Sequence, residues 1–167
     1  FDIAQFLTAL PKKLSYANIT DSTKINNRAH VITLLINNPE CINEQIPRST
    51  YEPHFNTHNS GWVQSPHIDT LKDVTRHKTL EPYVKGVIGR FKDDPRVLAW
   101  DLYNEPGNSG MANKSLPLVE ASFAWARQMK PAQPLTIGVR GGPKAISDRQ
   151  IDLSDIVSFH HYGANDS

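Results

Sequence analysis

The chain has 167 residues, a formal net charge of +1 at pH 7, and a single cysteine, Cys41. Its lysines and arginines are scattered among acids, which argues against a nucleic-acid or anionic membrane partner and favours a neutral ligand. No stretch approaches the roughly 20 apolar residues that span a bilayer, and one cysteine cannot form an intramolecular disulfide. The length suits one domain with a buried core.

The first part of the chain predicts a helix, a strand and two loops. Residues 1–10 carry apolar side chains at roughly helical spacing, whereas residues 11–28 are polar and are expected to form a loop. The run VITLLI, residues 31–36, is continuous, β-branched and followed by Asn-Asn-Pro, which is typical of a buried strand. Residues 37–76 show no sustained period and predict a long loop.

The rest of the chain alternates helices with strands. Apolar residues three and four apart predict helices over 80–91 and 116–129. Short apolar runs predict strands over 97–103, 134–139 and 155–162, with a Gly-Gly-Pro turn and a short, weakly patterned connection between the last two. This alternation implies βαβ units and a parallel sheet, so the expected fold class is α/β.

Polar residues follow each predicted strand at its carboxyl end. These ends meet at one rim of a parallel sheet, where α/β proteins place their chemistry. We therefore expect a ring of polar side chains formed by Asn37, Asn38, Asn104, Glu105, Arg140, His160 and Tyr162. His160 and Tyr162 share a strand face, whereas His161 points to the other face, which argues against one metal held by both histidines.

Glu105 is the candidate catalytic residue of this rim. It directly follows an apolar strand, and Pro106 is expected to restrict it to extended geometry. Apolar walls from Trp100 and Tyr103 are expected to raise the pKa of its carboxyl group, as protonation of a glycosidic oxygen requires. The amide of Asn104 suits a neighbouring sugar hydroxyl. For Asn-Glu-Pro alone, an ordinary turn with a solvated glutamate is the stronger reading.

The run RVLAWDLYNEPGN, residues 96–108, resembles the fourth-strand signature of retaining glycoside hydrolases with a (β/α)8 barrel, especially family 5 cellulases and mannanases and the family 2 barrels. Further similarity covers most of residues 58–162. The resemblance implies a partial (β/α)8 TIM barrel in which the predicted strands are approximately strands 3 to 6 with their helices. It makes Glu105 the general acid/base and Asn104 the residue that binds the sugar 2-hydroxyl.

The same resemblance suggests roles for residues around the reacting bond. His160 and Tyr162 look like the His-x-Tyr of the sixth strand, which lies nearest the scissile bond, the tyrosine usually helping to position the nucleophile. Trp62, in the long loop, is a candidate for stacking on a pyranose ring, with simple packing of the loop as an equal alternative. Relatives often have an aromatic residue where Arg140 stands. No metal or organic cofactor is implied, and the expected partner is a β-linked oligosaccharide or polysaccharide.

In this group the nucleophile is a glutamate that ends the seventh strand, which these 167 residues do not reach. Residues 1–167 are therefore expected to be a fragment of one catalytic barrel, inactive alone, from an enzyme that cleaves cellulose-, mannan- or xylan-like polysaccharide by double displacement. One alternative is a catalytically inactive carbohydrate-binding or scaffolding protein. Another is an unrelated metal-dependent barrel hydrolase that uses the histidines. Localisation stays open, with secretion or the periplasm considered for a full-length protein.

Overall fold

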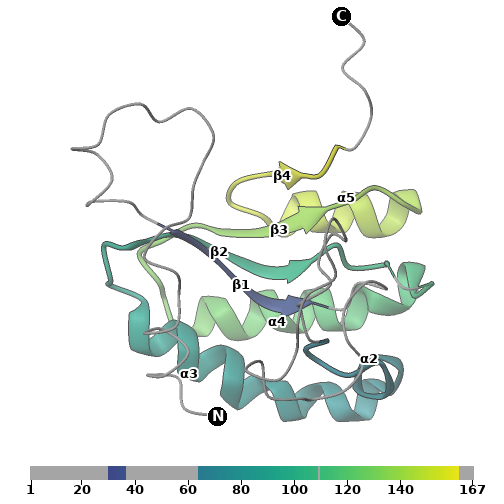
Figure 1. Cartoon of the computed structure of the whole chain (residues 1–167), viewed down its shortest axis with the longest axis horizontal. Coiled ribbons are helices and arrows are strands. Elements are labelled where there is room, and N and C mark those ends of the chain that lie inside the picture. The colour runs from purple at the N-terminus through teal and green to yellow at the C-terminus, as the bar shows by residue number, and fades with distance from the viewer. Residues whose placement is uncertain (1–29, 37–63, 109, 162–167) are drawn as a thin grey trace, which may run out of the picture.

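The computed structural model describes residues 30–36, 64–108 and 110–161. These residues form a parallel four-stranded sheet in the order β1-β2-β3-β4 (Figure 1). The strands are β1 (His30–Ile36), β2 (Val97–Asn104), β3 (Leu135–Val139) and β4 (Ser158–Phe159). Strands that follow one another in sequence are therefore neighbours in the sheet.

Helices connect the strands and pack on one face of the sheet (Figure 1). The helical segments are α2 (Ile68–Lys72), η3 (Val74–Leu80), α3 (Glu81–Phe91), η4 (Ala112–Ser115), α4 (Leu116–Gln128) and α5 (Lys144–Leu153). Helix α4 contacts α3 on one side and α5 on the other, so the three long helices form one layer. Sequential parallel strands under a single helical layer are the arrangement of part of a (β/α)8 barrel, which confirms the expected α/β class.

The hydrophobic core lies between the sheet and the helical layer. Helix α3 buries a stripe at three- and four-residue spacing, Val84, Val87 and Ile88, as the sequence predicts. Trp100 and Trp125 are buried there, 1% and 9% exposed. The other large side chains that are almost fully buried include Tyr103, Phe123, Leu35, Leu102, Leu118, Leu135 and Ile137.

A β-bulge in β2 shapes the carboxyl end of this strand. Asp101 pairs with Thr136 of β3, but Asn104 pairs with Gly138, so three steps along β2 match two along β3. Without the bulge, residues three apart would point to opposite faces; with it, Asp101 and Asn104 can share the face opposite the helices. Tyr103, inside the bulge, points to the helical side, where its hydroxyl bonds with Ser115 at the start of α4.

Two helical regions and one strand differ from the sequence-based expectation. Helix α5 occupies the stretch expected to be a weakly patterned connection, and α2 with η3 occupies part of the expected loop. The strand predicted over 155–162 is shorter, Ser158–Phe159; before it, Asp155 bonds to the start of β3, where its Oδ2 accepts from Leu135 N and its own N–H donates to Leu135 O. The helix expected over residues 1–10 lies outside the described residues. Within the described ranges, no helix is both long and apolar enough to cross a membrane.

Candidate active site

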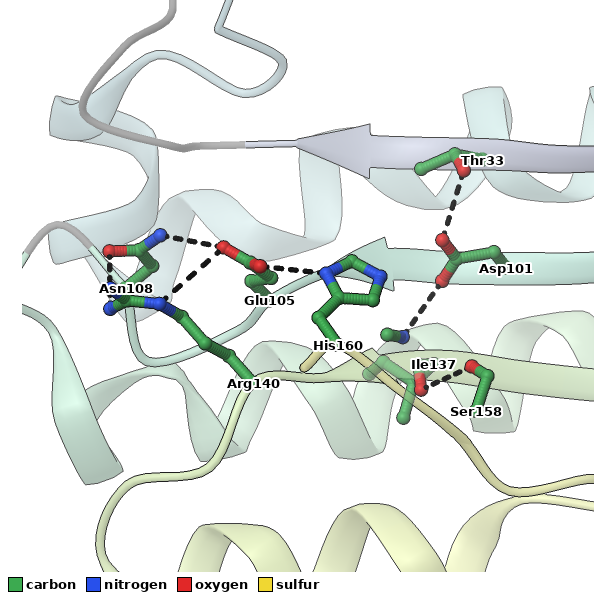
Figure 2. Close-up of polar contacts among 9 residues, drawn as sticks. Thr33, Asp101, Glu105, Asn108, Ile137, Arg140, Ser158 and His160 are labelled. Carbon is green, nitrogen blue, oxygen red and sulfur yellow. Dashed lines mark hydrogen bonds and ion pairs between the residues drawn. The ribbon is translucent and has the colours of Figure 1, made fainter. Parts of the chain in front are cut away.

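The rim at the carboxyl ends of β2, β3 and β4 brings together three ionisable side chains from distant parts of the sequence. Glu105 follows β2 directly, Arg140 follows β3, and His160 follows β4 (Figure 2). The strand-end rule predicted all three for one rim, and the structure places them in contact. Glu105 is only 3% exposed, which contradicts the alternative of an ordinary turn with a solvated glutamate.

The carboxyl group of Glu105 contacts a different polar partner with each oxygen. Oε1 lies 2.7 Å from Nδ1 of His160. Oε2 accepts a hydrogen bond of 2.9 Å from Nδ2 of Asn108, and Nε of Arg140 is 3.8 Å away. Arg140 also donates from Nη1 to Oδ1 of Asn108 at 3.2 Å, so the amide joins the guanidinium to the carboxyl group (Figure 2). Glu105 is thus fixed in orientation at both oxygens.

The backbone of Glu105 differs from the sequence-based expectation. Extended geometry before Pro106 was predicted, but Glu105 has a φ of 48°, in the left-handed region that residues with a side chain rarely adopt. Two backbone hydrogen bonds impose this turn: Glu105 N donates to Gly138 O at 2.9 Å, and Asn108 N donates to Glu105 O at 3.1 Å. Such strain, about 1 kcal/mol or more, is concentrated at functional sites in proteins.

The prediction that Trp100 and Tyr103 form apolar walls around the carboxyl group of Glu105 is also wrong. Tyr103 points to the helical side, and Trp100 donates from Nε1 to Gln133 Oε1 at 3.1 Å, at the opposite end of the strand from Glu105. The groups around the carboxyl oxygens are instead an imidazole, an amide and a guanidinium. The imidazole of His160 is the nearest of these groups, with Nδ1 at hydrogen-bond distance from Oε1 of Glu105.

Asn104 and Asp101 lie beneath this group on the same face of the sheet. Asn104 is 7% exposed, and its Oδ1 lies 3.5 Å from the point where a Cβ on Gly138 would sit. Asp101 accepts from Thr33 Oγ1 at 2.9 Å and from Gly138 N at 3.1 Å. Burial raises the pKa of Asp101, and these hydrogen bonds offset part of the rise.

Four of the candidate residues, Asn37, Asn38, Trp62 and Tyr162, lie outside the described residues. Among those described, no group of three or more histidine, cysteine, aspartate or glutamate residues is arranged to hold a metal ion. Sequence reasoning gave no role to Asn108, although it stands three residues after Glu105, a spacing at which side chains can meet across a turn. It also gave none to Gly138, whose place inside an apolar strand was the available signal.

Comparison with known proteins relates the chain to glycoside hydrolases at low identity. The sequence is 27% identical over 116 residues to a probable mannan endo-1,4-beta-mannosidase F of Emericella nidulans, which covers 59% of this chain and 27% of that protein. It is 29% identical over 62 residues to a mannan endo-1,4-beta-mannosidase F of Aspergillus clavatus. This second alignment covers 36% of this chain and 14% of that protein. The chain thus spans about a quarter or less of the length of these relatives.

A solved structure and a comparison with family profiles complete these findings. A b-glucuronidase from Ruminococcus gnavus, in complex with uronic isofagomine, aligns with a TM-score of 0.42 and 20% identity over 59% of this chain and 17% of that chain. No family profile matches the sequence.

Proposed function

We propose that the chain forms part of the catalytic barrel of a retaining β-glycoside hydrolase and that Glu105 is its general acid/base. The observation that carries the proposal is the placement of Glu105, a buried side chain directly after β2 whose Oε1 lies 2.7 Å from Nδ1 of His160. A carboxyl group held against a second titratable group can deliver a proton to a substrate and later take one back. The similarity to two mannan endo-1,4-beta-mannosidases supports a β-linked polysaccharide as substrate.

In the first half of the reaction, one proton resides between Glu105 Oε1 and His160 Nδ1. Glu105 gives this proton to the glycosidic oxygen while the bond from that oxygen to the anomeric carbon breaks, and a carboxylate nucleophile forms the new bond to carbon. The leaving sugar departs as an alcohol. Glu105 is then an anion, and the contacts of Asn108 and Arg140 with Oε2 stabilise its charge.

In the second half, a water molecule attacks the anomeric carbon. Glu105 takes the proton of that water, and the nucleophilic carboxylate leaves with the electrons of its bond to carbon. Two displacements at one carbon retain its configuration. Glu105 is protonated again beside His160, so the site returns to its starting state.

The nucleophile in this proposal is a carboxylate outside the described residues. Asp101 is the other carboxylate on this face, but it is 7% exposed and already accepts hydrogen bonds at both oxygens, from Thr33 and from Gly138. A retaining enzyme needs its second carboxyl group roughly 5 to 5.5 Å from the first and open to the substrate. Asp101 is therefore not proposed as the nucleophile.

Other rim residues would bind the sugar. Asn104 is proposed to bind the 2-hydroxyl next to the reacting carbon, since it precedes Glu105 and lies on the same face as His160. Tyr162 is proposed to position the nucleophile, and Trp62 to stack on a sugar ring. The substrate we propose is a β-1,4-linked mannan or glucan.

Sugar binding by the chain itself can be measured first. Titration of the ¹⁵N-labelled chain with β-1,4-mannotriose should shift the amide signals of Glu105 and His160, and Glu105→Gln should change the affinity. The matched control is Glu120→Gln, because Glu120 is an exposed residue of α4 that pairs with Arg149. The control should bind as the wild type does. Absence of any shift at the rim with both mannotriose and cellotriose would contradict the proposed site.

Hydrolysis is the second test, made with the longest natural polypeptide that contains these residues. Release of reducing sugar from β-mannan or β-glucan, with retained anomeric configuration, supports the enzyme. Binding without any release of sugar would instead support the alternative of a catalytically inactive carbohydrate-binding protein.

A further inference from the structure

Gly138 in strand β3 lies next to several residues of the candidate site. It lies in β3, between Asn104 of β2 and Ser158 of β4 in the strand register. Its carbonyl oxygen accepts the N–H of Glu105 at 2.9 Å. Its N–H donates to Oδ1 of Asp101 at 3.1 Å. The carbonyl and the N–H of this one residue therefore bind two different residues of the site, Glu105 and Asp101.

The absence of a side chain on Gly138 leaves room for the imidazole of His160. A Cβ at this position would lie 3.1 Å from Nε2 and 3.2 Å from Cε1 of His160, and 3.5 Å from Oδ1 of Asn104. Carbon atoms in comfortable contact are about 3.5 to 4.0 Å apart, so the imidazole ring occupies space that any side chain would take. Glycine inside a strand often marks such a close approach.

Asp101 fixes the backbone of Gly138 from below. Its carboxyl group is buried, and its two oxygens join Thr33 of β1 to Gly138 of β3 across β2 (Figure 2 shows the Thr33 contact). Figure 2 also shows the imidazole of His160 between the carboxyl groups of Glu105 and Asp101. Asp101 transfers no proton in the proposed reaction. We therefore interpret its hydrogen bonds as structural: they hold Thr33 of β1 and Gly138 of β3 in place.

We infer that Gly138 is a positioning residue, anchored by Asp101, that sets the contact between Glu105 and His160. Its carbonyl oxygen fixes the position of the Glu105 backbone through the hydrogen bond from Glu105 N. The absence of a Cβ lets the imidazole of His160 lie close to the backbone of β3. A shift of the ring by a few tenths of an ångström away from Glu105 would lengthen the 2.7 Å contact between Nδ1 and Oε1 to about 3.0 Å, and so weaken it. The catalytic meaning of this contact rests on the proposed function, but the contact itself does not.

The test is the ¹⁵N NMR signal of the His160 ring, recorded in the whole chain at neutral pH. His160→Gln assigns the signal, and Glu105→Ala gives its position when the contact is absent. Gly138→Ala should move the signal measurably from the wild-type position toward that reference. The matched control is Gly86→Ala, because a Cβ on Gly86 meets nothing within 4 Å. This control should leave the signal in place.

A second pair of variants covers the case in which Gly138→Ala fails to fold. Asp101→Asn keeps an acceptor for the N–H of Gly138 and removes the charge, and it should leave the Glu105–His160 contact intact. Asp101→Leu removes the acceptor as well as the charge, and it should move the His160 signal as Gly138→Ala does. A native-like spectrum with an unmoved His160 signal in Gly138→Ala, or in Asp101→Leu, would overturn the inference.

This experiment separates the inference from the proposed function. The ring signal reports the contact whether or not the chain ever cleaves a sugar, so loss of the enzymatic proposal leaves the result readable. Conversely, an unmoved signal in the variants would leave Glu105 available as a general acid/base while removing Gly138 and Asp101 from its support.

Discussion

Asp101→Asn should stabilise the protein at neutral pH, although it removes a charge that two hydrogen bonds satisfy. The asparagine introduced by this substitution can still accept from the N–H of Gly138 through its Oδ1, and its side-chain amide can donate to Thr33 Oγ1, whose hydroxyl rotates to suit. The hydrogen bonds with Thr33 and Gly138, at 2.9 and 3.1 Å, are therefore both replaced. What the substitution removes is the cost of holding a carboxylate out of water.

The sign and size of this effect follow from the burial of Asp101. Burial raises the pKa of Asp101 above its ordinary value of 3.8 despite the hydrogen bonds from Thr33 and Gly138, so the charged form is less stable in the folded chain than in the unfolded one. Replacement of the carboxylate by a neutral amide of the same shape removes this cost of burying a charge. Because two hydrogen bonds already offset part of the cost here, we expect a gain of about 1 kcal/mol.

The pH dependence gives the prediction its sharpest form. A raised pKa means that the stability contribution of Asp101 is fully present below its unfolded pKa and is lost as the pH rises through its folded pKa. The gain in Asp101→Asn should therefore be largest near neutral pH and should vanish below about pH 4. Urea denaturation at several pH values measures both. A variant less stable than the wild type at pH 7, or a gain of equal size at pH 3.5, would refute the reasoning.

Three further substitutions test other parts of the structure. Asp94→Asn removes the contacts with Arg96 that lower the pKa of Asp94 to about 2. Because Arg96 is exposed, the loss of stability at pH 7 should be only about 0.5 kcal/mol. This loss should disappear as the pH falls from 4 through 2, which urea denaturation at several pH values will show. Tyr103→Phe removes the buried hydroxyl bonded with Ser115 and should cost about 1 kcal/mol in urea denaturation at any pH from 5 to 9. Gly86 lies within α3, and a Cβ at this position would meet no atom within 4 Å. Gly86→Ala should therefore raise the free energy of unfolding by about 0.5 to 1 kcal/mol, and an unchanged or lower melting temperature would contradict this.

The main elements of the fold could be predicted because their apolar residues repeat. Helices α3 and α4 carry clear stripes, and β2 and β3 are short apolar runs, so their order and the parallel sheet followed from the sequence. Helix α5 was missed because its sequence, KAISDRQIDL, buries only Ile146 and Gln150. The α2 and η3 region was missed because side-chain caps define it: His67 accepts from Asp69 N, and Asp73 accepts from Thr75 N.

The candidate site was predicted in its location but not in its geometry. The rule that chemistry follows the carboxyl ends of parallel strands gave Glu105, Arg140 and His160 without any structure. The left-handed backbone of Glu105 could not be foreseen, because it depends on a hydrogen bond to Gly138, 33 positions away in the printed sequence. The polar surroundings of the carboxyl group depend in the same way on the bulge in β2, which turns Tyr103 toward the helices.

The most direct measurement of the central claim compares two leaving groups in Glu105→Gln, using the longest natural polypeptide that contains these residues. A general acid matters when the leaving oxygen needs a proton and matters little when it does not. The variant should cleave β-1,4-mannan or glucan about 100-fold or more slowly than the wild type. It should form the glycosyl-enzyme from a dinitrophenyl β-glycoside, whose leaving group departs as a stable anion, at nearly the wild-type rate. Equal losses with both substrates, or no loss with the polysaccharide, would show that Glu105 is not the general acid.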